Sequence, residues 1–245
     1  MLYNESIMNE AELKTSTKQR VVISLIAVVM LGSMIASYVA IVANGGKSGA
    51  TNTEITDEKA QEYYAAYSAK LAEFKEASSG DFKKFSGQLG AVGVYDEEAA
   101  NSNGVTTKEL VVGDGRELAS GDTNYLAYYV GWCADGTIFD SSLDDTDDPT
   151  SFTNALDASQ GMIEGWNEGV VGMKIGGIRR ITIPGEKAYG SSREICGGYD
   201  KPLRFLAMVV ANEEPFSTVV SELETAYMKV QYANYGIDYE AMMGM

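Results

Sequence analysis

Residues 131–142 read GWCADGTIFDSS, residues 161–170 read GMIEGWNEGV and residues 188–190 read AYG. Together they present aromatic and branched apolar side chains, with one prominent carboxylate at Asp140 and no obvious nucleophile or set of metal ligands. The chain contains no histidine, so no imidazole can act as a general base or bind a metal. This stretch therefore indicates an apolar binding pocket rather than a site for covalent or metal-assisted chemistry.

The composition limits the classes of function that remain. The chain has 245 residues, enough for one or two domains, and 45% of them are hydrophobic, enough for a real core. A net charge of −16 repels phosphate backbones, so no nucleic-acid partner is expected. The two cysteines form no CxxC motif, two sulfurs without histidine make no structural zinc site, and no P-loop or G-x-G-x-x-G fingerprint is present. We therefore expect neither a metal nor a cofactor.

Residues 21–43 contain no charged side chain. A helix of that length rises about 35 Å, which exceeds the roughly 30 Å of a hydrocarbon core. The segment predicts a transmembrane helix that anchors the chain to a membrane. The alternative is a signal peptide, whose apolar region is usually about 7–15 residues and for which Ala43 before Asn44 would be a weak cleavage site.

Charges beside this segment predict its orientation. Lys14, Lys18 and Arg20 precede it closely, whereas only Lys47 follows at a comparable distance. The positive-inside rule then makes residues 1–20 a cytoplasmic tail. The expected protein is a single-pass cell-membrane protein with an extracytoplasmic C-terminal domain.

The segment after the anchor begins with a tether. Residues 44–56 are rich in Gly, Ser, Thr and Asn and predict a flexible linker. Thr56 then suits a helix N-cap, and apolar residues at helical spacing predict a helix to about Ser78. Its aromatic stripe either packs on its own domain or binds a partner. Residues 81–107 lack a clear pattern, so residues 57–105 are expected to form a helical and then irregular segment.

The pattern changes to strands from Leu110 onwards. Strand-like runs occupy residues 110–112, 125–132, 137–139, 179–183 and 203–210, and Asp135-Gly136 suits a hairpin turn. Residues 162–171 predict one short helix, and residues 216–230 a helix within a C-terminal extension, 215–245. The predicted fold class is α+β, with a curved antiparallel sheet wrapped around the short helix.

Four blocks follow one another along residues 109–213. They are YVG (129–131) with DGTIFDSS (135–142), MIEGWNEG (162–169), ITIP (181–184) with AYG (188–190), and PLRF (202–205). In this order and spacing they resemble the FKBP-type peptidyl-prolyl cis-trans isomerase family. The resemblance implies an isomerase domain at residues 106–214.

The resemblance also implies a half-open apolar cup. Trp166 would form its floor, and its walls would be Tyr129, Phe139, Met162, Ile163, Tyr189 and Phe205, with a contribution from Phe152. Asp140 corresponds to the carboxylate of the family. The backbone N–H of Ile163 and the hydroxyl of Tyr189 would each hold a carbonyl of a proline-containing polypeptide.

The implied reaction suits such a cup. The barrier to rotation about a peptide bond is about 18–20 kcal/mol. The twisted transition state has lost amide resonance, so its charge separation is smaller than that of the planar amide. A dry apolar cup therefore penalises the planar form more, and it also buries the proline ring. No proton transfer is needed, which agrees with the absence of histidine.

Two segments depart from the pattern of the family. The flap, residues 191–201, lacks the usual prolines; Ile195 would replace its tip, and Gly197-Gly198 would make it flexible. Leu143, Asp144 and Asp145 follow the FDSS block in place of a basic residue. We therefore expect Asp140 to lack a cationic partner, acidic substrates to be repelled, and catalysis to be weakened more than peptide binding.

The two cysteines leave two alternatives. Cys133 lies at the hairpin end and Cys196 in the flap. Outside the membrane they would pair and fix the flap. Otherwise they remain separate thiols.

Three functions follow from these observations. The first is a membrane-anchored prolyl isomerase that assists the folding of exported proteins. The second is a proline-peptide-binding chaperone that keeps the cup without turnover. The third is a surface interaction protein whose aromatic helices, residues 57–78 and 216–230, contact a partner.

Overall fold

The computed structural model describes residues 54–244 of the chain. The predicted cytoplasmic tail, the predicted transmembrane helix at residues 21–43 and nearly all of the 44–56 linker therefore lie outside the described residues. Among the helices of residues 54–244, none combines the length and the apolar character that crossing a membrane requires.

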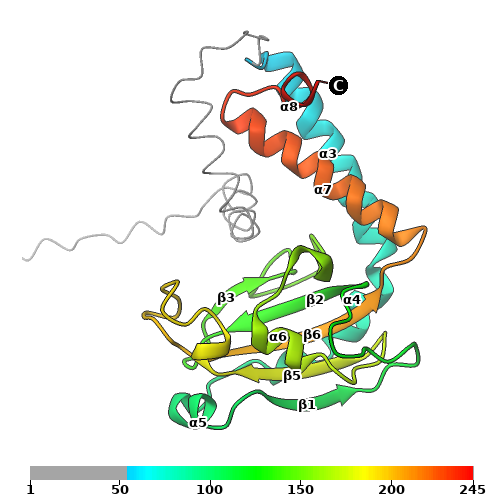
Figure 1. The fold of residues 1–245 in the computed structure, drawn as a ribbon. Coiled ribbons are helices and arrows are strands. Elements are labelled where there is room, and N and C mark those ends of the chain that lie inside the picture. The colour runs from blue at the N-terminus through cyan, green and yellow to red at the C-terminus, as the bar shows by residue number, and fades with distance from the viewer. Residues whose placement is uncertain (1–53, 245) are drawn as a thin grey trace, which may run out of the picture. The chain divides into compact units, whose positions relative to one another are not determined.

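A six-stranded antiparallel sheet forms the centre of the described fold (Figure 1). Its order is β1-β5-β6-β2-β3, and β4 pairs with β2. The strands are β1 (Thr106–Val111), β2 (Tyr125–Trp132), β3 (Ile138–Ser141), β4 (Leu156–Asp157), β5 (Ile178–Ile183) and β6 (Leu203–Ala211). The antiparallel sheet and the short helix predicted from the sequence are confirmed.

One face of the sheet packs against the short helix α6 (Glu164–Gly169). Two glycines permit this contact, because a Cβ at Gly165 would lie 2.2 Å from Ile183 Cγ2 and one at Gly169 would lie 2.3 Å from Ile181 Cγ2. The helix therefore lies close on β5. Alternate residues of β2, β5 and β6 complete this buried cluster, including Tyr125, Tyr129, Ile181, Ile183, Phe205, Ala207 and Val209.

The opposite face is covered by the segment before β1. Helix α4 (Ser79–Ser86) places Phe82 and Phe85 edge-on to Phe152, each with ring centroids 5.3 Å apart. Further along, the indole N–H of Trp132 donates to Gly93 O at 2.8 Å. The segment continues through η2 (Leu89–Ala91) and α5 (Glu97–Ser102). The prediction that residues 81–107 are irregular is therefore wrong. Buried Phe85 fixes α4 and the Asp96 side chain caps α5, and neither helix is long enough to show a periodic pattern.

Two long helices lie side by side and run antiparallel (Figure 1). They are α3 (Asp57–Ala77) and α7 (Phe216–Asn234), and both predicted helices are thus confirmed. Phe74 stacks on Phe216 at 5.9 Å, and Tyr67 contacts Tyr227 at 6.1 Å. The aromatic stripe of α3 therefore packs within the chain, which removes the observation behind the third hypothesis, a surface interaction protein.

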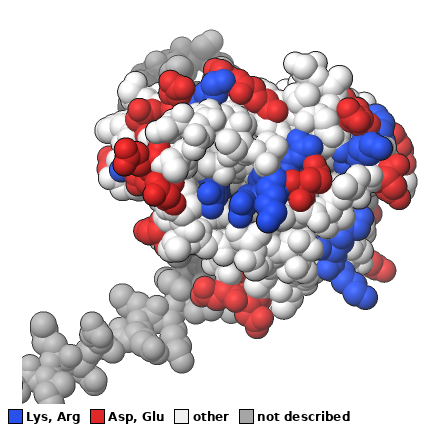
Figure 2. All heavy atoms as spheres, turned by 90° about the horizontal axis from the view of Figure 1, so that it is seen from below, with Lys and Arg blue, Asp and Glu red and all other residues white. Residues whose placement is uncertain are grey.

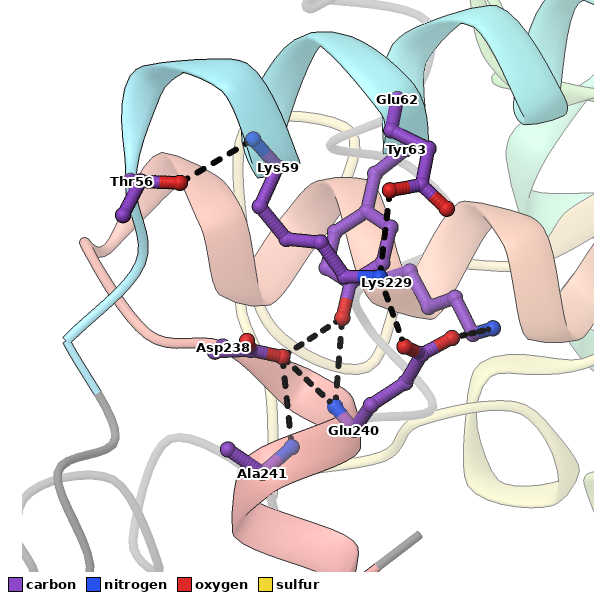
Figure 3. Close-up of polar contacts among 8 residues, drawn as sticks. All are labelled: Thr56, Lys59, Glu62, Tyr63, Lys229, Asp238, Glu240 and Ala241. Atoms are coloured by element: carbon purple, nitrogen blue, oxygen red, sulfur yellow. Dashed lines mark hydrogen bonds and ion pairs between the residues drawn. The ribbon is translucent and has the colours of Figure 1, made fainter.

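A polar network joins the far end of this helix pair to the last helix, α8 (Tyr239–Met243) (Figure 3). The Tyr63 hydroxyl donates to Asp238 Oδ1 at 2.6 Å. The ammonium groups of Lys59 and Lys229 lie 5.2 and 5.6 Å from the centroid of the Tyr63 ring. The same two lysines form ion pairs with Glu240 at 2.9 and 2.6 Å. Burial and the bond to Asp238 raise the pKa of Tyr63 to about 12, so the hydroxyl remains a donor.

The two ends of the described chain meet beside this network. The N–H of Ile55 donates to Gly236 O at 3.1 Å, and Glu54 forms a β-bridge with Ile237. The chain thus enters and leaves the described fold at adjacent points.

Replacing Tyr63 by phenylalanine should lower the free energy of unfolding by about 1 kcal/mol. The ring and its two lysine contacts remain in this variant, but Asp238 loses the hydroxyl that donates to it. Equilibrium denaturation measures the change. Tyr235→Phe is the matched control, because Tyr235 is 70% exposed and should tolerate the change. Equal effects of the two substitutions would contradict a stabilising role of the network.

Candidate functional site

An aromatic cluster lies on the face of the sheet that carries α6. Trp166 and Phe205 meet edge-on with centroids 5.5 Å apart, and Phe139 meets Phe205 edge-on at 5.7 Å. Tyr129 contacts Trp166 at 6.1 Å. Gly131 makes the Phe139 contact feasible, because a Cβ there would lie 2.7 Å from Phe139 Cζ and 2.8 Å from Phe205 Cε1. Such edge-to-face contacts fix the orientation of each ring.

Trp166 lies at the base of this cluster with 3% of its surface exposed. Helix α6 carries it, and its indole N–H donates to the Tyr125 hydroxyl at 3.0 Å. The polar atom of the buried ring is therefore satisfied, which keeps the ring in one position. Ile163 immediately precedes α6 and its carbonyl accepts from the N–H of Trp166 and of Asn167. Within residues 54–244 the N–H of Ile163 donates to no acceptor, which leaves it available to a ligand.

The structure brings most of the predicted site residues together. The partly exposed members that pack against the buried cluster are Phe139, Met162, Ile163 and Tyr189. The buried members are Tyr129, Trp166, Ile195 and Phe205. Side chains from three strands, α6 and the residues before it, the Tyr189 turn and the flap therefore converge on one place.

Phe152 is not among them, and the prediction that it lines the cup is wrong. Its ring is fully buried and stacks on Tyr128 at 3.9 Å, with Phe82 and Phe85 against its edge. Tyr128 points to the other face of the sheet, because side chains alternate along β2 and Tyr129 belongs to the cluster with α6. Phe152 is therefore a core residue behind the sheet.

Phe152→Ala should destabilise the fold by about 3–5 kcal/mol, the usual range for a fully buried phenylalanine. Phe139→Ala is the matched control and should cost less stability, since Phe139 is partly exposed. Denaturant unfolding measures both effects. Equal losses in the two variants would contradict the assignment of Phe152 to the core.

Asp140 lies at the edge of the cluster in an unusual environment. The Tyr129 hydroxyl donates to its Oδ2 at 2.6 Å, whereas its Oδ1 is buried and has no hydrogen-bond partner among residues 54–244. Burial raises the pKa of Asp140 to about 6, against the lowering effect of the Tyr129 hydroxyl and of the charge of Arg193. Burial and the adjacent carboxylate raise the pKa of Tyr129 well above its ordinary value. At neutral pH the pair is thus a neutral phenol bonded to a carboxylate.

Arg193 is the residue that the sequence prediction missed. It lies in the flap, and its guanidinium carbon is 4.7 Å from the centroid of the Tyr189 ring. It is also close enough for its charge to lower the pKa of both Asp140 and Tyr189. The cation whose charge acts on Asp140 thus comes from the flap rather than from the residues that follow FDSS, and within residues 54–244 no direct ion pair joins the two groups.

Hydrogen bonds within the acidic loop after the FDSS block hold it together. Asp144 accepts hydrogen bonds from the backbone and hydroxyl groups of Thr150 and Ser151, and its Oδ2 lies 3.3 Å from Lys75 Nζ. Burial would raise the pKa of Asp144, but these hydrogen bonds outweigh burial and hold the pKa below its ordinary value. This carboxylate therefore organises its loop.

The flap is joined to the sheet by a disulfide between Cys133 and Cys196. Cys133 follows β2 directly, and the two Cα atoms are 5.5 Å apart. Ile195, next to Cys196, is 8% exposed and packs into the cluster. Gly197 has a positive φ of 76°, which suits a glycine in the turn that closes on Ile195. The centre of the flap is thus held at two adjacent residues.

Comparison with known proteins adds independent findings. Residues 115–206 match the family model described as FKBP-type peptidyl-prolyl cis-trans isomerase. The chain is 43% identical over 88 residues to the FK506-binding protein of Neisseria meningitidis serogroup B. The matched region spans 36% of this chain and 76% of that relative. It is 45% identical over 89 residues to FK506-binding protein 4 of Gibberella zeae, of which it covers only 17%.

A solved structure is also similar. The peptidyl-prolyl cis-trans isomerase of Pseudomonas syringae pv. tomato shares 25% identity, with a TM-score of 0.34 over 55% of this chain and 94% of that one.

Proposed function

The chain belongs to the FKBP-type peptidyl-prolyl cis-trans isomerase family, and from this premise we propose that its isomerase acts through the aromatic cup, outside the cytoplasm, on exported proteins. The protein is an enzyme of this type. The use of the aromatic cup as the active site, the residues that line it and the location of the domain outside the cytoplasm are proposed.

Catalysis in the cup needs no proton transfer. The proline ring is buried against Trp166, Phe139 and Phe205, whose edge-to-face contacts support a rigid apolar wall. The planar amide has the larger charge separation, so an apolar surrounding disfavours it relative to the twisted amide. Each 1.4 kcal/mol of this difference accelerates rotation tenfold.

Two groups at the rim hold the substrate backbone. The N–H of Ile163 and the hydroxyl of Tyr189 each donate to a carbonyl on either side of the rotating bond. Burial raises the pKa of Tyr189, so its hydroxyl stays protonated and remains a donor. The observation that carries the proposal is that Ile163 and Tyr189, the residues with these donors, both pack against the aromatic cluster around Trp166.

A proline-limited refolding assay with the full-length chain in detergent tests the site. The wild type should accelerate the slow phase, and Phe139→Ala and Tyr189→Ala should each lower kcat/KM by about tenfold or more, as loss of about 1.4 kcal/mol of transition-state stabilisation requires. Tyr235→Ala, at an exposed tyrosine on the C-cap of α7, should leave the rate unchanged. Full activity of both cup variants would contradict the proposed site, and binding without acceleration would favour a chaperone.

The membrane part of the proposal rests on the sequence. Residues 21–43 carry no charge, and the basic residues lie before them, which supports an anchor with the isomerase domain outside. The disulfide also supports an oxidising compartment. Protease added to intact cells or spheroplasts should remove residues 54–245 while the cytoplasmic tail survives. Complete protection of the domain would overturn this orientation.

A further inference from the structure

Arg193 is a cation whose charge acts on both Asp140 and Tyr189, two residues of the site. Its side chain is half-buried, and its guanidinium carbon lies 4.7 Å from the centroid of the Tyr189 ring. Arg193 forms no direct ion pair with another residue of the range 54–244. A guanidinium has five N–H donors, and stacking on a ring leaves most of them available.

Neither of the two carboxylates near Arg193 neutralises its charge at the rim of the cup. Asp140 lies close, but its carboxylate is buried and already accepts the Tyr129 hydroxyl. Glu194 follows Arg193 directly and is exposed to solvent, where its charge is screened. A substrate side chain that approaches the cup therefore meets the guanidinium before it meets the buried carboxylate.

The flap holds Arg193 in this position. Cys196, three residues further on, is bonded to Cys133, and Ile195 is packed in the cluster. The other anchor is Tyr189 itself, whose ring lies under the guanidinium. An arginine placed between two fixed points loses less freedom when it binds an anion than one on a mobile loop.

We propose that Arg193 is a specificity-determining residue, which selects polypeptides with an acidic side chain next to the proline. The proposal rests on the proposed function, because it assumes that the cup is the isomerase site. It reverses the expectation that the acidic loop after the FDSS block repels acidic substrates. The net charge of −16 does not describe every place on the surface: Figure 2 shows Lys and Arg side chains gathered in the middle of one face, with Asp and Glu around them.

The test compares peptides that differ only beside the proline. Two series, Ala-Xaa-Pro-Phe and Ala-Leu-Pro-Xaa, with Xaa as Glu, Gln or Lys, are assayed on the full-length protein in detergent. The wild type should prefer Glu over Lys by about fivefold in kcat/KM in at least one series, the upper end for an ion pair open to solvent. The preference should appear mainly in KM and should weaken in 0.5 M salt.

Variants then separate Arg193 from the general charge. Arg193→Gln should abolish the preference, measured within each variant as the ratio of kcat/KM for the Glu and Lys peptides, whereas Arg193→Lys should keep part of it. The matched control is Arg180→Gln, which removes the same charge from the opposite face of the sheet and should keep the preference. Arg180 lies on that face because its neighbour Ile181 belongs to the cluster with α6.

The possible failures are distinguishable. Absence of activity on every peptide would contradict the proposed function itself. Activity without a preference for Glu, or a preference that survives Arg193→Gln, would overturn the role of Arg193 and leave the isomerase intact. A preference lost equally in Arg180→Gln would assign it to the overall charge instead.

Discussion

Replacing Cys133 and Cys196 together with alanine should lower the free energy of unfolding by about 4 kcal/mol, because the disulfide closes a loop of 63 residues. In the chain-entropy account, the bond restricts the unfolded chain, and a loop of this length loses more freedom than a short one. The pair also holds the flap beside the cup, so the double variant should have a raised KM for proline peptides.

Denaturant unfolding of the full-length chain, with activity measured in parallel, checks both effects. The wild type with reductant is the second measurement, because it removes the bond without changing either side chain. The two should agree in stability. A loss below about 1 kcal/mol in both would contradict the stabilising effect of the bond, and an unchanged KM would show that the flap holds its place without it.

Asp140→Asn should stabilise the protein at neutral pH by at most about 3 kcal/mol, since a pKa near 6 implies that the folded protein disfavours the charged carboxyl. Between about pH 4 and 6 the unfolded chain has released this proton while the folded chain still holds it. The stability of the wild type therefore falls as the pH rises through this window. The asparagine amide can still accept the Tyr129 hydroxyl, so the hydrogen bond remains.

Denaturation at pH 4 and at pH 7 tests this prediction. The advantage of Asp140→Asn should be small at pH 4, where much of the carboxyl is protonated, and largest above pH 6. Asp148→Asn removes the same charge from an exposed loop position and should give no comparable gain. If both variants stabilised equally, the effect would come from net charge rather than from the buried carboxyl.

The sequence predicted the sheet, α6 and the two long helices, because each depends on a local pattern. The aromatic-rich run at residues 125–132 indicates a strand, which the fold buries on both faces. Helical spacing in residues 57–78 indicates which side of that helix is buried. The cup was predicted through the resemblance, whose blocks contain Tyr129, Phe139, Trp166, Tyr189 and Phe205. These residues come together because the strands that carry them are neighbours in the sheet.

The missed features depend on contacts between distant segments. Phe152 was placed in the cup through the resemblance, but its ring packs against Phe82 and Phe85 behind the sheet. The helices between residues 79 and 102 are too short for a periodic signal. Arg193 was missed because only the residues that directly follow Asp140 were considered as a source of positive charge. The flap places Arg193 near Asp140 although the two are more than fifty residues apart in the sequence.

The meeting of Ile55 with Gly236 makes this fold a natural candidate for circular permutation. A short glycine linker from the end of α8 back to Glu54 could close residues 54–244 into a ring, and new ends could open in an exposed loop such as the one around Asp147. In the unpermuted chain, a protein fused after α8 would begin next to the point at which the chain enters the described fold. Attachment through either of these two points would turn the same side of the molecule towards a support.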